Sequence, residues 1–110
     1  MVLDKRVEMC LLMDFYGSML TVKQRNIMHK YYEQDISLVE IGDEEGISRQ
    51  AVRDALITSE KVLNTCEEKL GFVSKHNVLK NSIDEIINDI DSNIDKVHLI
   101  KKLKSLSKNL

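Results

Sequence analysis

The chain has 110 residues, of which 43% are hydrophobic and 31% are charged, with a net charge of −2 and no proline. This length predicts one domain with a modest core, and the domain should be helical throughout because only caps and glycines are present to interrupt helices. No apolar run approaches the ~20 residues that span a bilayer, and the N-terminus lacks a signal-peptide core, so we expect a soluble, cytoplasmic protein without membrane insertion.

The first part of the chain predicts two helices. Apolar residues recur with a helical period over residues 2–16, and Gly17 ends that helix. Thr21 and Gln24 have the spacing of a capping box, which predicts a second helix that runs to about Glu33. This helix should bury Ile27, Met28, Tyr31 and Tyr32, and it should leave Lys23, Arg25 and Lys30 in solvent.

The segment from residue 37 to residue 56 predicts a helix-turn-helix. Ser37 and Glu40 have capping-box spacing for a first short helix, and Leu38 and Ile41 form its apolar face. A plain corner between two helices is the alternative, because a capped helical hairpin can have the same pattern.

Two glycines suit the geometry of this motif. Gly46 lies where the chain turns sharply, a position that favours positive φ and a residue without Cβ. Gly42 permits the two helices to approach closely, Ile47 fills the corner, and Ser48 caps the second helix. That helix should face the first with Ala51, Val52, Ala55 and Leu56, and it should point Arg49, Gln50 and Arg53 outward.

The second helix of the motif continues beyond residue 56. Apolar residues follow at a helical period until Gly71 provides a stop, so we expect a helix of about 22 residues. Downstream, two more pairs have capping-box spacing, Ser82 with Glu85 and Ser92 with Asp95. We therefore expect two helices at about 75–91 and 92–107, and one continuous helix is the alternative. The predicted fold is an all-α, single-domain bundle of roughly five or six helices.

The C-terminal helices carry an isoleucine-rich stripe that the rest of the chain can cover only in part. We therefore divide the chain into a helix-turn-helix core, residues 1–73, and a helical extension, residues 74–110, which packs on the core, on a second copy of the chain, or on both. A monomer in which the last helix folds back over the stripe is the alternative to a homodimer. The predicted dimer interface consists of Ile83, Ile86, Ile87, Ile90, Ile94 and Val97.

The helix-turn-helix is also the most acidic part of the chain. Residues 37–60 carry six acidic and two basic side chains, whereas residues 61–110 carry seven acidic and nine basic ones. Duplex binders ordinarily present a basic surface. Two functions therefore stay open: base recognition by Arg49, Gln50 and Arg53, which suit guanine and adenine edges, or docking of the motif on a protein partner.

The sequence contains no motif of an enzyme or a metal site. Nucleotide-binding, hydrolase and metalloprotease signatures are all missing. Cys10 and Cys66 are far apart in apolar contexts, which favours reduced core thiols. We expect a non-enzyme without cofactor or metal, because the histidines lack ligand spacing and the acidic run is the wet face of a helix. The histidines are His29, His76 and His98, and the acidic run is Asp84, Glu85, Asp89, Asp91 and Asp95.

A resemblance to region 4 of bacterial sigma factors is carried by LTVKQRNIMHKYYEQDISLVEIGDEEGISRQAVRDAL, which runs from Leu20 to Leu56. With LLMDFYGSMLT before it and the isoleucine-rich tail behind it, the whole chain looks more like the YlxM family of small bacterial helix-turn-helix proteins, most clearly over residues 3–75. The resemblance implies a regulatory role in the signal recognition particle pathway, with components of that particle as partners and with DNA a better expected ligand than RNA. The positions that match the groove-binding helix are Ser48, Arg49, Gln50 and Arg53, and Lys23 and Arg25 match the positions that would contact phosphates.

Overall fold

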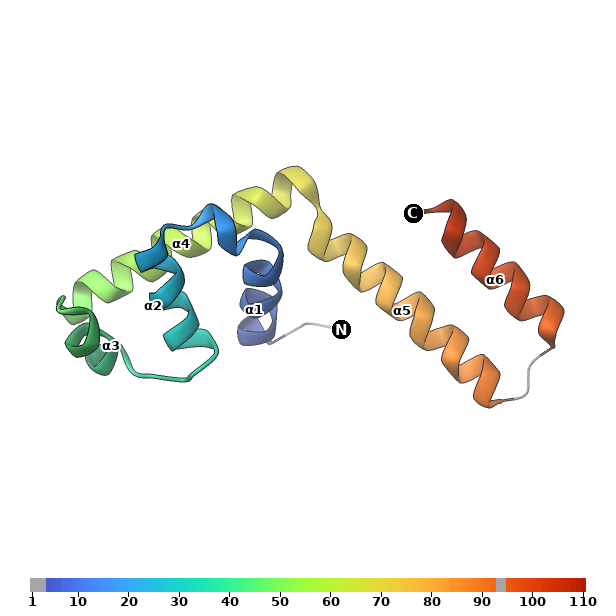
Figure 1. Ribbon diagram of the computed structural model, residues 1–110, viewed down its shortest axis with the longest axis horizontal. Helices are drawn as coiled ribbons and strands as arrows, with labels where there is room; N and C mark the ends of the chain where they lie inside the picture. Colours follow the sequence, from blue (N-terminus) through green and yellow to red (C-terminus); the bar gives the residue numbers. More distant parts are fainter. Residues whose placement is uncertain (1–3, 93–94) are drawn as a thin grey trace. The chain divides into compact units, whose positions relative to one another are not determined.

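The computed structural model describes residues 4–92 and 95–110, and over these residues it contains six α-helices, one 3-10 turn and no strand (Figure 1). The all-α prediction is confirmed. The chain forms two compact units, residues 1–73 and residues 74–110. The elements are α1 (Lys5–Tyr16), η1 (Gly17–Met19), α2 (Val22–Tyr32), α3 (Leu38–Glu45), α4 (Arg49–Leu70), α5 (Phe72–Asp91) and α6 (Lys96–Lys108).

The first unit is built around α4. Helices α1, α2 and α3 all contact α4 and lie on one side of it in Figure 1. Val52 and Leu63 of α4 are completely buried, and so are Ile27 and Met28 of α2 and Ile41 of α3. Burying side chains of this size contributes about 1.5–3 kcal/mol each, so the apolar stripes predicted for these helices form the main favourable term of this unit.

Local capping chemistry sets the start of α1 and of α2. Asp4 caps α1 by accepting a hydrogen bond from the Arg6 amide at 3.0 Å. The helix ends before Gly17 as predicted, but Gly17 has φ −57° and continues the chain as a 3-10 turn. The predicted capping box of α2 is confirmed, because the Thr21 hydroxyl accepts from the Gln24 amide at 3.1 Å and the Gln24 side chain accepts from the Thr21 amide at 3.0 Å.

A polar cluster fixes the junction between α4 and α5. Helix α4 ends at Gly71, whose φ of 67° is left-handed, as the stop predicted at this position requires. The Tyr16 hydroxyl donates to Glu67 Oε1 at 2.6 Å and accepts from the Phe72 amide at 3.0 Å. Glu67 Oε1 also accepts from the Val73 amide at 3.0 Å. These bonds satisfy the first amides of α5, so the predicted start near residue 75 is wrong and α5 begins at Phe72.

The second unit is a hairpin in which α6 returns along α5 (Figure 1). The Lys102 ammonium on α6 donates to Glu85 at 2.6 Å and also to Asp89, both on α5. The prediction of two helices is thereby confirmed over one continuous helix. The two predicted caps are wrong. Asp95 caps α6, with Oδ1 accepting from the Val97 amide at 3.2 Å, whereas Ser82 lies inside α5.

The residues predicted for a dimer interface differ in exposure. Ile86 is buried, at 7% exposed, whereas Ile83, Ile87, Ile90 and Val97 are between 43% and 59% exposed. Ile94 lies outside the described residues. The hairpin therefore leaves most of the predicted stripe open to a partner, and it uses Ile86 for burial within one chain.

Candidate nucleic-acid interface

The turn between α3 and α4 depends on two glycines with different tasks. Gly46 has φ 70°, the left-handed conformation expected of it. Gly42 lies inside α3, and a Cβ added there would lie 2.6 Å from the Ile47 carbonyl oxygen. The Ile47 amide donates back to the Gly42 carbonyl at 2.9 Å. Gly46 thus permits the reversal of the chain, and Gly42 permits the start of α4 to lie directly against α3.

Side-chain caps begin both helices of the motif. The Ser37 hydroxyl accepts from the Glu40 amide at 3.2 Å, and within the described chain only this half of the predicted capping box forms. The Ser48 hydroxyl accepts from the Ala51 amide at 3.0 Å and caps α4. Because an accepting hydroxyl keeps its own proton, Ser48 can still donate to a phosphate oxygen.

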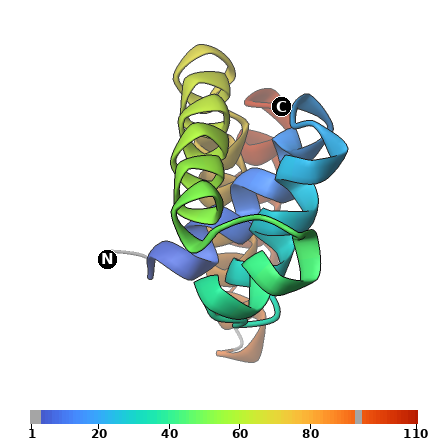
Figure 2. The same cartoon turned by 90° about the vertical axis from the view of Figure 1, so that its left-hand side faces the viewer.

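The start of α4 presents polar side chains to solvent. Val52 and Leu56 point into the core, whereas Arg49, Gln50 and Arg53 are exposed, as predicted. In Figure 2 the end of the unit that holds α3, the turn and the first residues of α4 faces the viewer. The exposed surface of Ser48, Arg49, Gln50 and Arg53 is called the α4 polar face below.

Two of these side chains are unengaged and one is weakly held. Within the described residues, no hydrogen bond or ion pair engages the guanidinium group of Arg49 or of Arg53. The Gln50 amide donates to Asp54 at 3.0 Å. An exposed contact between residues four apart on a helix is worth about 0.2–0.5 kcal/mol, less than the ~1–3 kcal/mol of a bidentate base contact, so Gln50 can exchange Asp54 for a base.

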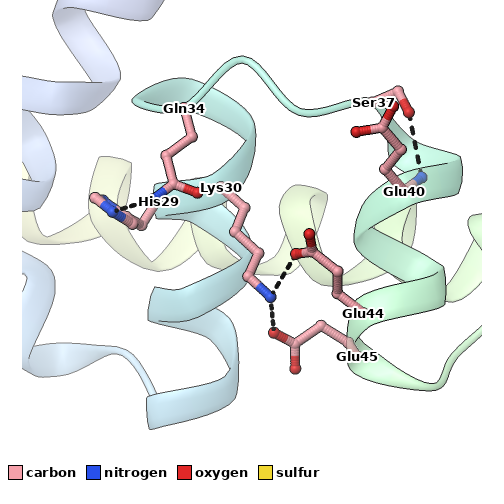
Figure 3. A network of polar contacts seen from close by, with 7 residues as sticks. All are labelled: His29, Lys30, Gln34, Ser37, Glu40, Glu44 and Glu45. Carbon is pink, nitrogen blue, oxygen red and sulfur yellow. Dashed lines mark hydrogen bonds and ion pairs between the residues drawn. The ribbon is translucent and has the colours of Figure 1, made fainter.

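Lys30 is not solvated as predicted but bridges α2 and α3. Its ammonium lies 2.8 Å from a Glu44 carboxylate oxygen and 2.9 Å from a Glu45 carboxylate oxygen (Figure 3). These hydrogen bonds raise the pKa of Lys30, so it stays charged. Carboxylates are unfavourable at the C-terminal end of a helix dipole, and the ammonium from α2 offsets that repulsion. Glu45 therefore binds Lys30, and within the described residues no ion pair joins it to the exposed Arg53.

A second contact pairs another acidic side chain of residues 37–60, Glu60, with a base. Lys5 Nζ lies 3.0 Å from Glu60 Oε1, and the Tyr32 hydroxyl donates to the same oxygen at 2.6 Å. Burial and this hydrogen bond raise the pKa of Tyr32. Three of the six acidic side chains of residues 37–60 are therefore paired with bases from outside that segment, namely Glu44, Glu45 and Glu60.

The remaining predicted phosphate contacts lie on another helix. Lys23 and Arg25 are exposed on the first turn of α2, and in the described part of the chain neither has an ion-pair partner. Helix α2 packs against α4, and the described residues show no hydrogen bond or ion pair between these two side chains and the α4 polar face. Their assignment as phosphate contacts stays a prediction.

In the loop between α2 and α3, sequence reasoning missed the conformation and the contact of Asp35. Asp35 has φ 57°, and its carboxylate accepts from Arg6 Nη2 at 2.9 Å. Aspartate is one of the few side chains that adopt this conformation at modest cost. The residue type was therefore an available signal for the turn, but its partner on α1 was not.

The described residues contain no candidate metal site and no candidate membrane span. No group of three or more histidine, cysteine, aspartate or glutamate side chains among them could hold a metal ion. Cys10 and Cys66 are free and half-buried. No described helix has both the length and the apolar composition needed to cross a membrane.

The Lys30 contact gives a first testable prediction. Replacing Lys30 by glutamine should leave Glu44 and Glu45 unpaired and should weaken nucleic-acid binding by about two- to five-fold at low salt, through added negative potential. Fluorescence anisotropy with a labelled duplex measures this change. Lys61→Gln removes the same charge from an exposed position of α4 and should have a smaller effect. Equal effects would show that only net charge matters.

The sequence is similar to those of other helix-turn-helix proteins. A family model described as "Putative helix-turn-helix protein, YlxM / p13 like" matches residues 3–106. A UPF0122 protein of Caldanaerobacter subterraneus is 51% identical over 83 residues, which cover 76% of this chain and 71% of the relative. A UPF0122 protein of Desulforamulus reducens is 47% identical over 81 residues, which cover 74% and 69%. A UPF0122 protein of Halalkalibacterium halodurans is 39% identical over 104 residues, which cover 94% and 95%.

Proposed function

Because the chain belongs to the UPF0122 family of YlxM / p13-like helix-turn-helix proteins, we propose that it is a cytoplasmic regulatory protein that binds nucleic acid, DNA in preference to RNA, through the α4 polar face. The observation that carries the proposal is the pair of arginines, Arg49 and Arg53, which are exposed and unengaged on the first turns of a capped helix. The proposal assigns no catalytic role to the chain.

Each residue of the α4 polar face has a contact that its chemistry suits. Arg49 and Arg53 can each donate two hydrogen bonds to guanine, and Gln50 can bond adenine on the major-groove edge. The Ser48 hydroxyl and the free amides at the start of α4 suit a phosphate, since a helix N-terminus favours an anion. Lys23 and Arg25 would add phosphate contacts that fix position without selecting sequence.

The acidic composition of the motif is a weaker objection than the linear charge count suggests. Lys30 and Lys5 pair with Glu44, Glu45 and Glu60, which leaves Glu40, Asp43 and Asp54 without a basic partner in the described residues. Two basic side chains from outside the segment thus reduce its negative charge, and the α4 polar face itself carries positive charge.

A salt series tests this proposal. Anisotropy with a random duplex pool, single-stranded DNA and RNA should show tightest binding to duplex DNA, with the logarithm of the affinity falling by about 0.9 per phosphate contacted for each decade of salt. Absence of binding to every probe at low salt, at protein concentrations near ~100 μM, would refute the proposal.

Docking on a protein is the second candidate function. It is favoured by the exposed carboxylates of Glu40 and Asp43 on α3, which suit a basic partner. The family resemblance points to the signal recognition particle, so the partner we propose for this case is a basic protein component of that particle. Purified particle protein, with and without its RNA, should be titrated with the chain. Binding that Glu40→Gln and Asp43→Asn abolish, while Arg49→Ala does not, would support docking.

We also propose a homodimer formed by the exposed part of the α5 and α6 stripe. Ile83, Ile87 and Ile90 each leave at least 43% of the side chain in water, and covering such side chains contributes roughly 1.5–3 kcal/mol each when burial is complete. A two-fold dimer is the commonest closed arrangement that does so.

Light scattering at ~10–100 μM should therefore give the mass of two chains. Ile87→Asp and Ile90→Asp should halve that mass without lowering helix content, because both side chains are exposed in one chain. Ile57→Asp, at an exposed isoleucine of α4, is the matched control and should leave the dimer intact. A wild-type mass of one chain throughout that range would contradict the dimer.

A further inference from the structure

Helix α6 carries a basic surface that the helix-turn-helix does not account for. The helix contains lysines and no acidic residue. Lys101, Lys104 and Lys108 are spaced three and four residues apart, so they share one face of the helix. Together with Ser105 and Ser107 they line an open hollow, and none of the described residues in its lining is acidic. This surface is called the α6 lysine face.

Four of the five lysines of α6 fall into two classes by their contacts. Lys102 is mostly buried, at 24% exposed, and it is held by Glu85 and Asp89 of α5. Lys101, Lys104 and Lys108 are exposed, and no ion pair within the described residues engages them. Among the described residues, Lys102 is thus the lysine of α6 whose ion pairs join the two helices. The ammonium groups of Lys101, Lys104 and Lys108 are therefore available to bind an anion.

The spacing and chemistry of the α6 lysine face suit a chain of phosphates. At a rise of about 1.5 Å per residue, the three ammonium groups extend over roughly 10 Å of helix, which is the axial length of about three phosphates along one strand. The two serine hydroxyls between them can donate further hydrogen bonds to phosphate oxygens. A single small anion would use only one of these positions, so a polyanion fits better.

Nucleic acid is favoured over an anionic membrane as that polyanion. The lining of the face contains only lysine and serine, and α6 has no tryptophan or phenylalanine, which membrane-surface helices commonly insert from the opposite face. Leu99 and Leu106 of α6 are half-buried, and the exposed apolar side chains of the helix, Val97, Ile100 and Leu103, are not among the residues that line the hollow. The α4 polar face of the same chain is proposed to bind nucleic acid, so nucleic acid is a ligand that suits both faces.

We infer that the α6 lysine face binds the phosphate backbone of the nucleic acid and adds a sequence-independent contact to that of α4. The inference rests on the proposed function in that the ligand is the same nucleic acid. It assigns the affinity and salt dependence of the complex in large part to α6 and the sequence preference to α4. The two contributions can be measured separately.

The test replaces Lys101, Lys104 and Lys108 together by glutamine, which keeps helix propensity and removes three charges. Against a random duplex pool and a random RNA pool, affinity at ~50 mM salt should fall roughly 10- to 100-fold, and the logarithmic salt slope should decrease by about two to three. The control replaces Lys61, Lys69 and Lys80 by glutamine, which makes the same change in net charge at exposed positions. The control should change affinity less than about threefold, since separated surface charges are screened. Arginine at positions 101, 104 and 108 should retain binding.

The outcomes separate this inference from the proposed function. A decrease of about two to three in the logarithmic salt slope of the Lys101, Lys104 and Lys108 variant, with its sequence preference kept, supports the inference. An unchanged slope overturns it, even where Arg49→Ala and Arg53→Ala weaken binding and so support the proposed function. Equal losses in the variant and the control also overturn it. So does wild-type binding to phosphatidylglycerol vesicles in the absence of binding to either nucleic-acid pool.

Discussion

Replacing Arg49 and Arg53 together by alanine should lower the affinity for a preferred DNA duplex by about 2–6 kcal/mol. Each guanidinium is exposed and unengaged in the described structure, so each can form a bidentate contact worth ~1–3 kcal/mol against the wrong base. The two losses need not add, because residues four apart on a helix are neighbours that can share one binding step. Competition anisotropy with the preferred duplex and a scrambled duplex measures both affinity and preference.

A matched variant separates base contact from simple charge. Arg49→Lys with Arg53→Lys keeps both positive charges but lacks the planar fork that matches guanine. This variant should retain the salt slope and should lose the preference between duplexes. Both variants should keep the wild-type melting temperature, because neither side chain is part of the core. If the alanine variant binds the preferred duplex as tightly as the wild type, α4 is not the contact surface.

The elements that the sequence predicted well depend on neighbouring residues. The capping box of Thr21 and Gln24 forms as expected because its two bonds need only one helical turn. Gly46 and Gly71 both adopt left-handed φ, because each ends a helix and glycine is the residue that most readily takes this conformation there. The exposure of Arg49 and Arg53 follows from the same period that buries Val52. Helical periodicity and capping are therefore enough to orient the candidate site.

The features that the sequence could not predict depend on partners far along the chain. The sequence around Lys30 does not differ from that of a solvated lysine. Its partners, Glu44 and Glu45, are 14 and 15 residues away and come close to it only because α2 packs against α3. The start of α5 depends on Tyr16, which lies more than 50 residues earlier and reaches Glu67 and the Phe72 amide. Because a charge count along the sequence leaves out the pairing of Lys30 with Glu44 and Glu45, it overstates the negative potential of the motif.

Capping rules also leave a choice where two caps compete. Ser92 and Asp95 lie three residues apart, and either side chain can accept hydrogen bonds from the first amides of a helix. The structure uses Asp95, which starts α6 later than predicted. This later start leaves Lys96–Lys108 as a helix without acidic residues. The predicted helix began at residue 92 and so included Asp95, which made the basic composition of α6 less evident.

Replacing Gly42 by valine should destabilise the first unit by roughly 3 kcal/mol. A Cβ at this position would lie 2.6 Å from the Ile47 carbonyl oxygen, and a backbone atom cannot move aside as a flexible side chain can. Inserting atoms into a packed contact costs about 1–3 kcal/mol, and more where backbone has to shift. The gain in helix propensity from glycine to valine is a few tenths of a kcal/mol and does not offset this cost. Urea denaturation followed by circular dichroism gives the free energy of unfolding.

The other glycines of this unit provide graded controls. Gly46→Val should cost less, about 1–3 kcal/mol, because φ is 70° but no atom lies within 4 Å of the added Cβ. Gly17→Ala should be neutral or stabilising by up to ~1 kcal/mol, since its φ of −57° suits alanine and the space is open. A cost for Gly42→Val no larger than that of Gly17→Ala would mean that α4 does not start against α3. In that case the α4 polar face would lack the fixed position from which Arg49 and Arg53 are proposed to contact bases.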